Sequence, residues 1–105
     1  MIDLSIIIVS YNTKEVLLDC LRSVYAHTTA ITFEVIVVDN NSKDGTVSAL
    51  KEAHVAATII ANSDNRGFAK AVNQGLIVSR GRHVLLLNSD TIVKDQAFAI
   101  MAAYL

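Results

Sequence analysis

The sequence of 105 residues contains no proline, no tryptophan and a single cysteine. One cysteine excludes a disulfide-stabilised scaffold and a zinc module built from cysteine ligands. The sequence also lacks an excess of one charge sign, because its 9 basic and 10 acidic residues leave a formal net charge of −1. That balance provides no basic field for a phosphate backbone, so we expect no nucleic-acid partner. The hydrophobic fraction of 52% is too high for a disordered chain and indicates one globular domain.

Long hydrophobic runs are missing as well. The first apolar stretch, Leu4 to Val9, follows the acidic Asp3 rather than a basic segment. It is far shorter than the roughly 20 apolar residues of a membrane span, and it does not resemble a secretory leader. We therefore expect a cytoplasmic domain. Attachment to the inner face of a membrane, through parts outside these residues, stays open.

The chain does contain four short apolar runs. Each is continuous rather than alternating, which is typical of strands covered on both faces of a parallel sheet. The runs comprise residues 4–9, 33–38, 58–61 and 83–87, of which 58–61 is the weakest. Helical periodicity fills the segments between and after them, at residues 12–25, 44–53, 68–79 and 95–105. This order of strand and helix, four times over, predicts a three-layer α/β/α Rossmann-like fold with a parallel sheet.

Local signals refine the predicted helix ends. Asn12 or Thr13 can cap the first helix, and Asn12 followed by Glu15 resembles a capping box. Gly81 stands where a C-terminal cap of the third helix belongs. Gly67 and Gly75, at the start and within that helix, permit close approach of its backbone to a neighbour or a ligand.

Polar residues follow every predicted strand, at the end where parallel sheets bind ligands. Asp39 and Asp90 each follow an apolar run. If the first, second and fourth strands are neighbours, both carboxylates reach one crevice. Carboxylate oxygens suit Mg²⁺ or Mn²⁺, whose coordination is usually completed by substrate phosphates. Such acids are also ordinary turn and helix-cap residues, so a purely structural interpretation stays open.

Familiar phosphate-binding motifs are absent from the sequence. There is no P-loop, and no glycine-rich turn follows the first strand, which argues against NAD or FAD. Other residues offer a different route to a nucleotide. The Tyr11 ring provides a face for stacking a base, and Asp39 can accept a hydrogen bond from a ring N–H. Arg66 precedes a predicted helix N-terminus, where a diphosphate is favoured.

Other reactive side chains give weaker signals. His27, His54 and His83 lack the spacing of metal ligands. Cys20 lies beside the apolar stripe of the first helix, so we expect a buried thiol rather than a nucleophile. A phosphoacceptor receiver domain also carries an aspartate at a strand end. It needs an acid cluster and a late lysine that this sequence does not have in place.

Taken together, the strand exits resemble the nucleotide-sugar half of family 2 glycosyltransferases of the GT-A fold. The matching segments are residues 5–12, 34–46, 65–75 and 85–91, which span nearly the whole chain in the order and spacing of the family. The resemblance implies transfer of a sugar, with inversion, from a UDP- or dTDP-sugar to an acceptor hydroxyl, assisted by Mg²⁺ or Mn²⁺. The acceptor would be a saccharide, a lipid-linked sugar or a protein, as in cell-wall or polysaccharide biosynthesis.

The resemblance also implies a role for individual nucleotide-binding residues. Ser10 and Tyr11 would hold the base, with Tyr11 stacking on it. Asp39 would bind the ring N–H of uracil or thymine. Arg66 would lie near the base or the diphosphate. Asn88 would also contact the nucleotide, because it stands at the first position of the family's Asp-x-Asp-type motif.

The acidic motif after the fourth strand departs from the family's fullest form. Asp90 would be the last acid of an Asp-x-Asp-type motif and would ligate the divalent metal. Asn88 stands where the fullest motif has aspartate. The departure weakens a two-carboxylate site and leaves Asp90 as the main protein ligand.

A second departure concerns length, because the family fold continues well beyond 105 residues. We expect the acceptor pocket and the general base beyond Leu105, so no catalytic residue is assigned within the chain. Residues 1–105 are then the donor-binding part of a transferase domain, incomplete at its C-terminus and inactive by itself. The alternative is a non-catalytic module that binds nucleotide or self-associates, the latter through an exposed sheet edge.

Overall fold

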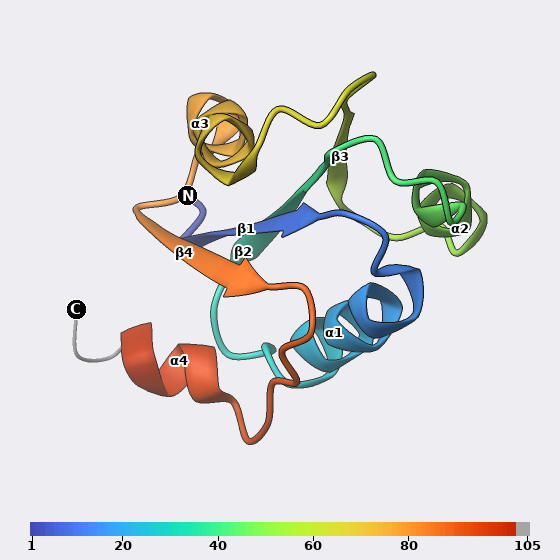
Figure 1. Cartoon of the computed structure of the whole chain (residues 1–105). Coiled ribbons are helices and arrows are strands. Elements are labelled where there is room, and N and C mark those ends of the chain that lie inside the picture. Colours follow the sequence, from blue (N-terminus) through green and yellow to red (C-terminus); the bar gives the residue numbers. More distant parts are fainter. Residues whose placement is uncertain (103–105) are drawn as a thin grey trace.

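Four parallel strands and four helices alternate along the chain in a computed structural model that describes residues 1–102 (Figure 1). The strands form one sheet in the order β3-β2-β1-β4, with every pair parallel. They are β1 (Leu4–Ser10), β2 (Phe33–Asp39), β3 (Thr58–Ala61) and β4 (His83–Asn88). The helices are α1 (Lys14–Ala26), α2 (Thr46–Glu52), α3 (Phe68–Val78) and α4 (Ala97–Ala102). The predicted order of elements is confirmed.

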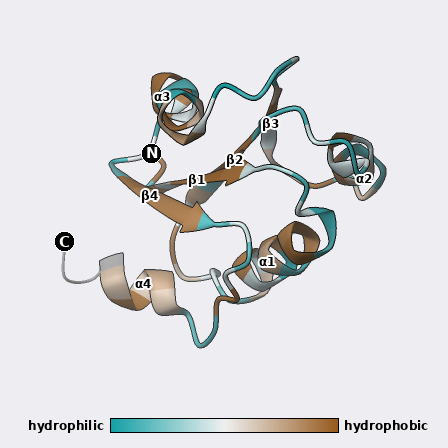
Figure 2. Ribbon diagram, viewed as in Figure 1, coloured by the Kyte–Doolittle hydropathy of each residue, from teal (hydrophilic) through white to brown (hydrophobic). Residues whose placement is uncertain are grey.

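The helices cover the sheet on both faces. Helices α1, α2 and α4 lie on one side and α3 lies on the other (Figure 1). Along β1, Ile6 and Ile8 pack into the core on the α1 side, whereas Ile7 packs with Ala71 of α3. Figure 2 shows the hydrophobic residues concentrated along the strands and the hydrophilic ones in the β3–α3 loop. Burial on both faces explains the continuous apolar runs and confirms the predicted three-layer arrangement.

Helix positions agree with the periodicity, with small differences at the ends. The fourth helix begins at Ala97 rather than at the predicted Asp95, whose φ of +55° is not helical. The part of that prediction that falls on residues 103–105 lies outside the described residues. Among the helices of residues 1–102, none combines the length and hydrophobicity needed to cross a bilayer.

Gly75 lets α3 lie close against β1. A Cβ atom at this position would stand 2.7 Å from Cγ2 of Ile7, closer than side chains pack. The predicted close approach is therefore to a neighbouring strand.

The predicted capping box at the start of α1 is wrong. Thr13 is the N-cap residue and makes no side-chain cap hydrogen bond, while Asn12, with a φ of +54°, accepts a hydrogen bond at Oδ1 from the Lys43 N–H at 2.7 Å. The first-turn N–H of Lys14 donates instead to Oδ2 of Asp44 at 3.0 Å. Glu15 is exposed and takes no part in a cap. The cap of α1 thus comes from the loop after β2, a contact that local sequence spacing does not reveal.

The predicted helix cap at Gly81 is also wrong. Helix α3 ends at Val78, and Ser79 follows in an extended conformation with ψ of 143°. Gly81 lies against the start of β1, where its N–H donates to Oγ of Ser5 at 2.7 Å. A Cβ at Gly81 would stand 2.5 Å from the backbone nitrogen of Ser5. Glycine is required at position 81 because its backbone lies against the backbone of Leu4 and Ser5.

We expect Gly81→Ala to destabilise the domain, because the added methyl meets backbone atoms of β1 that cannot rotate away. Overpacking of this kind costs about 1–3 kcal/mol in the free energy of unfolding, measured by urea denaturation. The matched control is Arg82→Ala at the adjacent exposed position, which should stay within about 0.5 kcal/mol of the parent. Equal stability of the Gly81→Ala chain and the parent would contradict this role.

Candidate functional site

The sheet order brings three strand ends together. β1 lies between β2 and β4, so the carboxyl ends of all three meet at one edge. In the β1–β2 register Ser10 lies opposite Asp39, and in the β1–β4 register Val9 lies opposite Asn88. The predicted order of neighbouring strands is therefore present, but only Asp90 of the two carboxylates lines the hollow between β1 and β4, and Asp39 lies outside that lining.

Asp39 is held in a fixed orientation beneath this edge. Its side chain is only 1% exposed. Oδ1 accepts hydrogen bonds from Oγ of Ser10 at 2.8 Å and from Oγ of Ser42 at 2.6 Å, and Oδ2 accepts one from the Ser42 N–H at 2.9 Å. Two of the predicted residues are thus in direct contact. Ser42 was not singled out from the sequence, although serine three residues after an aspartate is a frequent turn signal.

The loops after β1 and β2 are joined by further hydrogen bonds. The Asn12 N–H donates to Oγ of Ser42 at 2.8 Å. Asp44 accepts at Oδ2 from the first turn of α1 and at Oδ1 from the N–H and hydroxyl of Thr46, which begins α2. The Thr46 hydroxyl, followed by the Lys14 N–H, lowers the pKa of Asp44 below its ordinary value. One carboxylate thereby holds the N-termini of both helices beside the Asp39 cluster.

A hollow of about 520 Å³ opens between the ends of β1 and β4. This is where the strand order reverses, the place at which open parallel sheets bind ligands. Two predicted residues, Asn88 and Asp90, lie in it, and both are exposed. The complete lining is Val9, Thr13, Val16, Phe68, Leu87, Asn88, Ser89 and Asp90. Thr13 and Phe68 were not predicted as site residues. They become part of the site only because β4 pairs with β1, which the sequence does not reveal.

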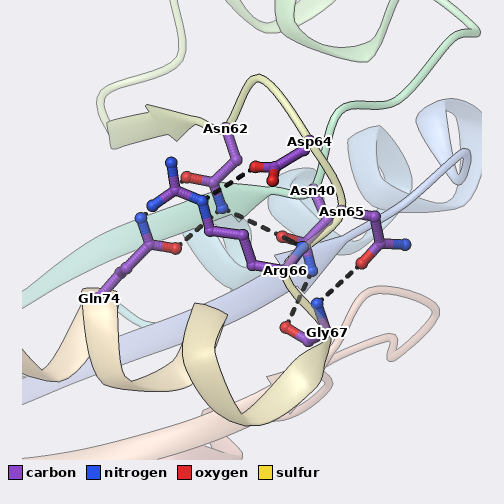
Figure 3. Close-up of polar contacts among 7 residues, drawn as sticks. All are labelled: Asn40, Asn62, Asp64, Asn65, Arg66, Gly67 and Gln74. Atoms are coloured by element: carbon purple, nitrogen blue, oxygen red, sulfur yellow. Dashed lines mark hydrogen bonds and ion pairs between the residues drawn. The ribbon is translucent and has the colours of Figure 1, made fainter.

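Tyr11 and Arg66 lie at the same edge but outside this hollow. Tyr11 directly follows Ser10, and its side chain is 49% exposed, as stacking on a base requires. Arg66 lies in the loop after β3, on the far side of β2 from β4. Its Nε donates to Oδ1 of Asp64 at 3.1 Å in an exposed pair (Figure 3). The structure therefore does not bring Arg66 together with Asp90.

The hollow has the ligand chemistry of a hard divalent cation only in part. No group of three histidine, cysteine, aspartate or glutamate side chains gathers among residues 1–102. The β4 end offers one carboxylate at Asp90, one amide at Asn88 and one hydroxyl at Ser89. Thr13, across the hollow, has a buried Oγ1 with no hydrogen-bond partner in the described structure. One carboxylate with neutral oxygens fits Mg²⁺ or Mn²⁺ whose remaining ligands are phosphates.

Cys20 lies beneath the end of β4. It is fully buried, and its Sγ is 3.8 Å from the carbonyl oxygen of Asn88. Burial, and next the negative charge of Asp90, raise the pKa of the thiol to about 11. At neutral pH the group is an inert thiol, as its place on the apolar stripe predicted.

A second hollow of about 380 Å³ lies between α1 and the segment after α2. It contains none of the residues predicted to bind a nucleotide. Its lining is Leu18, Leu21, Arg22, Tyr25, Ala53, His54, Val55 and Ala56. We expect no nucleotide to bind at this surface.

The sequence matches the family described as glycosyl transferase family 2 over residues 5–105, and the chain belongs to that family. The resemblance and the GT-A fold class expected from the strand exits are thereby confirmed. The uncharacterized glycosyltransferase YfnE of Bacillus subtilis is 39% identical over 97 residues, which is 90% of this chain and 25% of that protein.

Two solved structures show the same fold. S. aureus TarS, in a complex with UDP-GlcNAc, superposes with a TM-score of 0.85 at 26% identity, over 98% of this chain and 31% of that one. The mannosyltransferase PcManGT from Pyrobaculum calidifontis, in a complex with GDP-Man and Mn²⁺, gives a TM-score of 0.82 at 28% identity, over 91% of this chain and 30% of that one. The chain thus spans about a quarter to a third of the length of these relatives.

We expect Ser42→Ala to destabilise the fold, because the buried Asp39 carboxylate and the Asn12 N–H each lose a partner. A hydrogen bond to a charged group contributes about 1.5–3 kcal/mol. The free energy of unfolding, measured in urea, should fall by about this amount. Ser48→Ala, on the exposed side of α2, is the control and should be nearly neutral. Indistinguishable urea midpoints for the two variants would show that Ser42 does not hold Asp39.

Proposed function

We propose that this chain binds the nucleoside diphosphate of a nucleotide-sugar as the donor-binding part of a glycosyltransferase. The donor is a UDP- or dTDP-sugar, and the complete enzyme transfers the sugar, with inversion, to a hydroxyl of a saccharide, lipid-linked or protein acceptor. The acceptor pocket and general base belong to the part of such enzymes outside residues 1–105. Because these groups are not among the assigned residues, the chain alone binds donor without turnover.

The observation that carries the proposal is the gathering of the polar strand exits at one edge. Ser10, Tyr11 and Asp39 lie at the ends of β1 and β2, and Asn88 and Asp90 lie in the hollow beside them. A nucleotide laid across this edge meets a base-binding cluster and then an acidic hollow. TarS with UDP-GlcNAc and PcManGT with GDP-Man support this assignment, because each superposes on nearly the whole chain.

The hydrogen bonds at Asp39 suggest how the base is recognised. Oδ1 accepts from two hydroxyls, whereas Oδ2 accepts from one N–H and keeps a lone pair. A ring N–H of uracil or thymine would donate to Oδ2, with the exposed Tyr11 ring stacked on the face of the base. Ser10 and Ser42 contribute by holding the carboxylate in one orientation before the base arrives.

Asp90, with Asn88 and Ser89 beside it, would hold a divalent cation together with the donor diphosphate. When bound, Mg²⁺ or Mn²⁺ stabilises the negative charge of the departing nucleoside diphosphate. The residues of this chain orient the donor so that its sugar projects from the β1–β4 hollow. Arg66 would approach the base or the diphosphate from the side of β3, after its exposed pairing with Asp64 opens.

A non-catalytic, self-associating module is the second candidate. β4 is an edge strand of the sheet, and Val84 and Leu86 on it are 41% and 49% exposed. An exposed apolar edge favours pairing with another chain. This alternative predicts a concentration-dependent dimer, which light scattering detects, whereas the donor-binding proposal requires nucleotide affinity whatever the oligomeric state.

We expect isothermal titration calorimetry to show that UDP or dTDP binds this chain more tightly with Mn²⁺ than without it. Asp90→Ala should weaken binding in Mn²⁺ by at least about tenfold, which corresponds to ~1.4 kcal/mol, because the main protein ligand is lost. GDP is titrated in parallel, because PcManGT holds a guanine nucleotide.

Glu52→Ala is the matched control, because it removes one negative charge at the end of α2. It should bind like the parent chain. Metal-independent binding, or an Asp90→Ala chain that binds as tightly as the parent in Mn²⁺, would contradict the role of Asp90. A chain that binds none of the three nucleotides would contradict donor binding itself.

A further inference from the structure

Three amide side chains join the carboxyl ends of β2 and β3 to helix α3 (Figure 3). Asn40 follows β2, Asn62 follows β3 and Gln74 lies on α3. Nδ2 of Asn62 donates to Oδ1 of Asn40 at 3.0 Å and to Oε1 of Gln74 at 2.8 Å. Nε2 of Gln74 donates back to Oδ1 of Asn62 at 2.8 Å. None of these contacts belongs to the Asp39 cluster or to the β1–β4 hollow.

Two of the three amides are buried and the third, Gln74, is partly buried. Asn40 and Asn62 are 3% and 7% exposed. Buried amides contribute to stability only while their partners are present, and each one left without a partner costs about 1–3 kcal/mol. Because Asn62 depends on Gln74, and Asn40 accepts from Asn62, the three side chains have one mutually consistent arrangement. An apolar cluster between α3 and the ends of β2 and β3 would allow the helix to slide, whereas these directional hydrogen bonds hold it in one position.

The free end of the network reaches the turn that carries Arg66. Nδ2 of Asn40 donates to the carbonyl oxygen of Gly67 at 3.1 Å, and Oδ1 of Asn40 accepts from the Arg66 N–H at 3.4 Å. One side chain thus spans the turn on both sides of the Arg66 Cα atom. Gly67 has a φ of +80°, a conformation that glycine adopts readily and that other residues rarely adopt.

The same network also touches the backbone of Asp39. The Asn62 N–H donates to the Asp39 carbonyl oxygen at 2.9 Å, and Asn40 is the next residue along the chain. Among residues 1–102, the Arg66 guanidinium is paired only with the exposed Asp64, and an exposed pair of this kind contributes little to stability. The backbone of the turn is therefore fixed, while the side chain stays free to exchange Asp64 for a ligand.

We propose that Asn40, Asn62 and Gln74 are positioning residues, which set the Arg66 turn over the end of β2 so that the guanidinium reaches a donor bound at Asp39. The inference rests on the proposed function, because it assumes that a nucleotide occupies this edge. Gln74 acts through Asn62 and Asn40 and does not itself touch the donor. Loss of Gln74 should therefore lower the affinity that Arg66 provides and leave the rest of the binding energy unchanged.

The test is a double-mutant cycle on UDP, dTDP and GDP affinity, measured by calorimetry with Mn²⁺. Gln74→Met keeps the volume and helix propensity but removes both hydrogen bonds to Asn62. It should weaken binding about five- to tenfold. In an Arg66→Ala background the same substitution should change the affinity less than twofold, because the contact that the network positions is already gone. A residue that merely stabilises the fold would not show this dependence on Arg66.

Two further variants keep the result interpretable. Gln74→Glu is isosteric and removes only the N–H that donates to Asn62. It is used in place of Gln74→Met if circular dichroism shows that the Gln74→Met chain is unfolded. Asn73→Asp, at the adjacent exposed position of α3, is the control for the added charge and should bind like the parent.

Three results would overturn the positioning role. Gln74→Met could bind as tightly as the parent, it could weaken binding equally in both backgrounds, or Arg66→Ala could leave the affinity unchanged. In the first two cases only the positioning role fails. An unchanged affinity of Arg66→Ala also removes the proposed contact of Arg66 with the donor, while nucleotide binding by the parent chain still supports the donor-binding function. A parent chain that binds none of the three nucleotides overturns the proposed function and the positioning role together.

Discussion

The pairing of β1 with both β2 and β4 is the constraint on which the rest of the structure depends. β1 is buried on both faces, and its register with each neighbour brings Ser10 beside Asp39 and Val9 beside Asn88. The candidate contacts at Ser10, Asp39 and Asn88 follow from these two registers, whereas Arg66 depends on the pairing of β2 with β3. Because β1 is apolar on both faces, burial alone does not distinguish one register from the next, and the Ser10–Asp39 hydrogen bond across the ends of β1 and β2 is available only in this register.

Hydrogen bonds between loops then convert the strand ends into a defined surface. Ser42 and Asp44, both after β2, contact the loop after β1 and the first turn of α1. Asn40 and Asn62 do the same between β2, β3 and the start of α3. The carboxyl edge is thus a continuous polar layer over an apolar sheet, with one hollow at the β1–β4 junction.

Most of the fold could be predicted from the sequence, because doubly covered strands leave continuous apolar runs that need no tertiary information to recognise. The polar strand exits were equally visible, and they led to the family that the comparison confirms. What could not be predicted depends on residues far apart in sequence. Asp44 caps α1 from the neighbouring loop, and Gly81 is required by the backbone of Ser5. The pairing of Arg66 with Asp64 arises from the path of one loop, which composition does not determine.

The central claim is that a nucleotide lies across the carboxyl edge of β2, β1 and β4. Titration of the ¹⁵N-labelled chain with UDP and Mg²⁺, followed by ¹H–¹⁵N correlation spectra, tests it most directly. We expect the largest chemical-shift changes at Ser10, Tyr11, Ser42 and Asp90. The hollow between α1 and the segment after α2 should show no change. Changes centred on Tyr25 and Val55 in that hollow, with the carboxyl edge unchanged, would contradict the account.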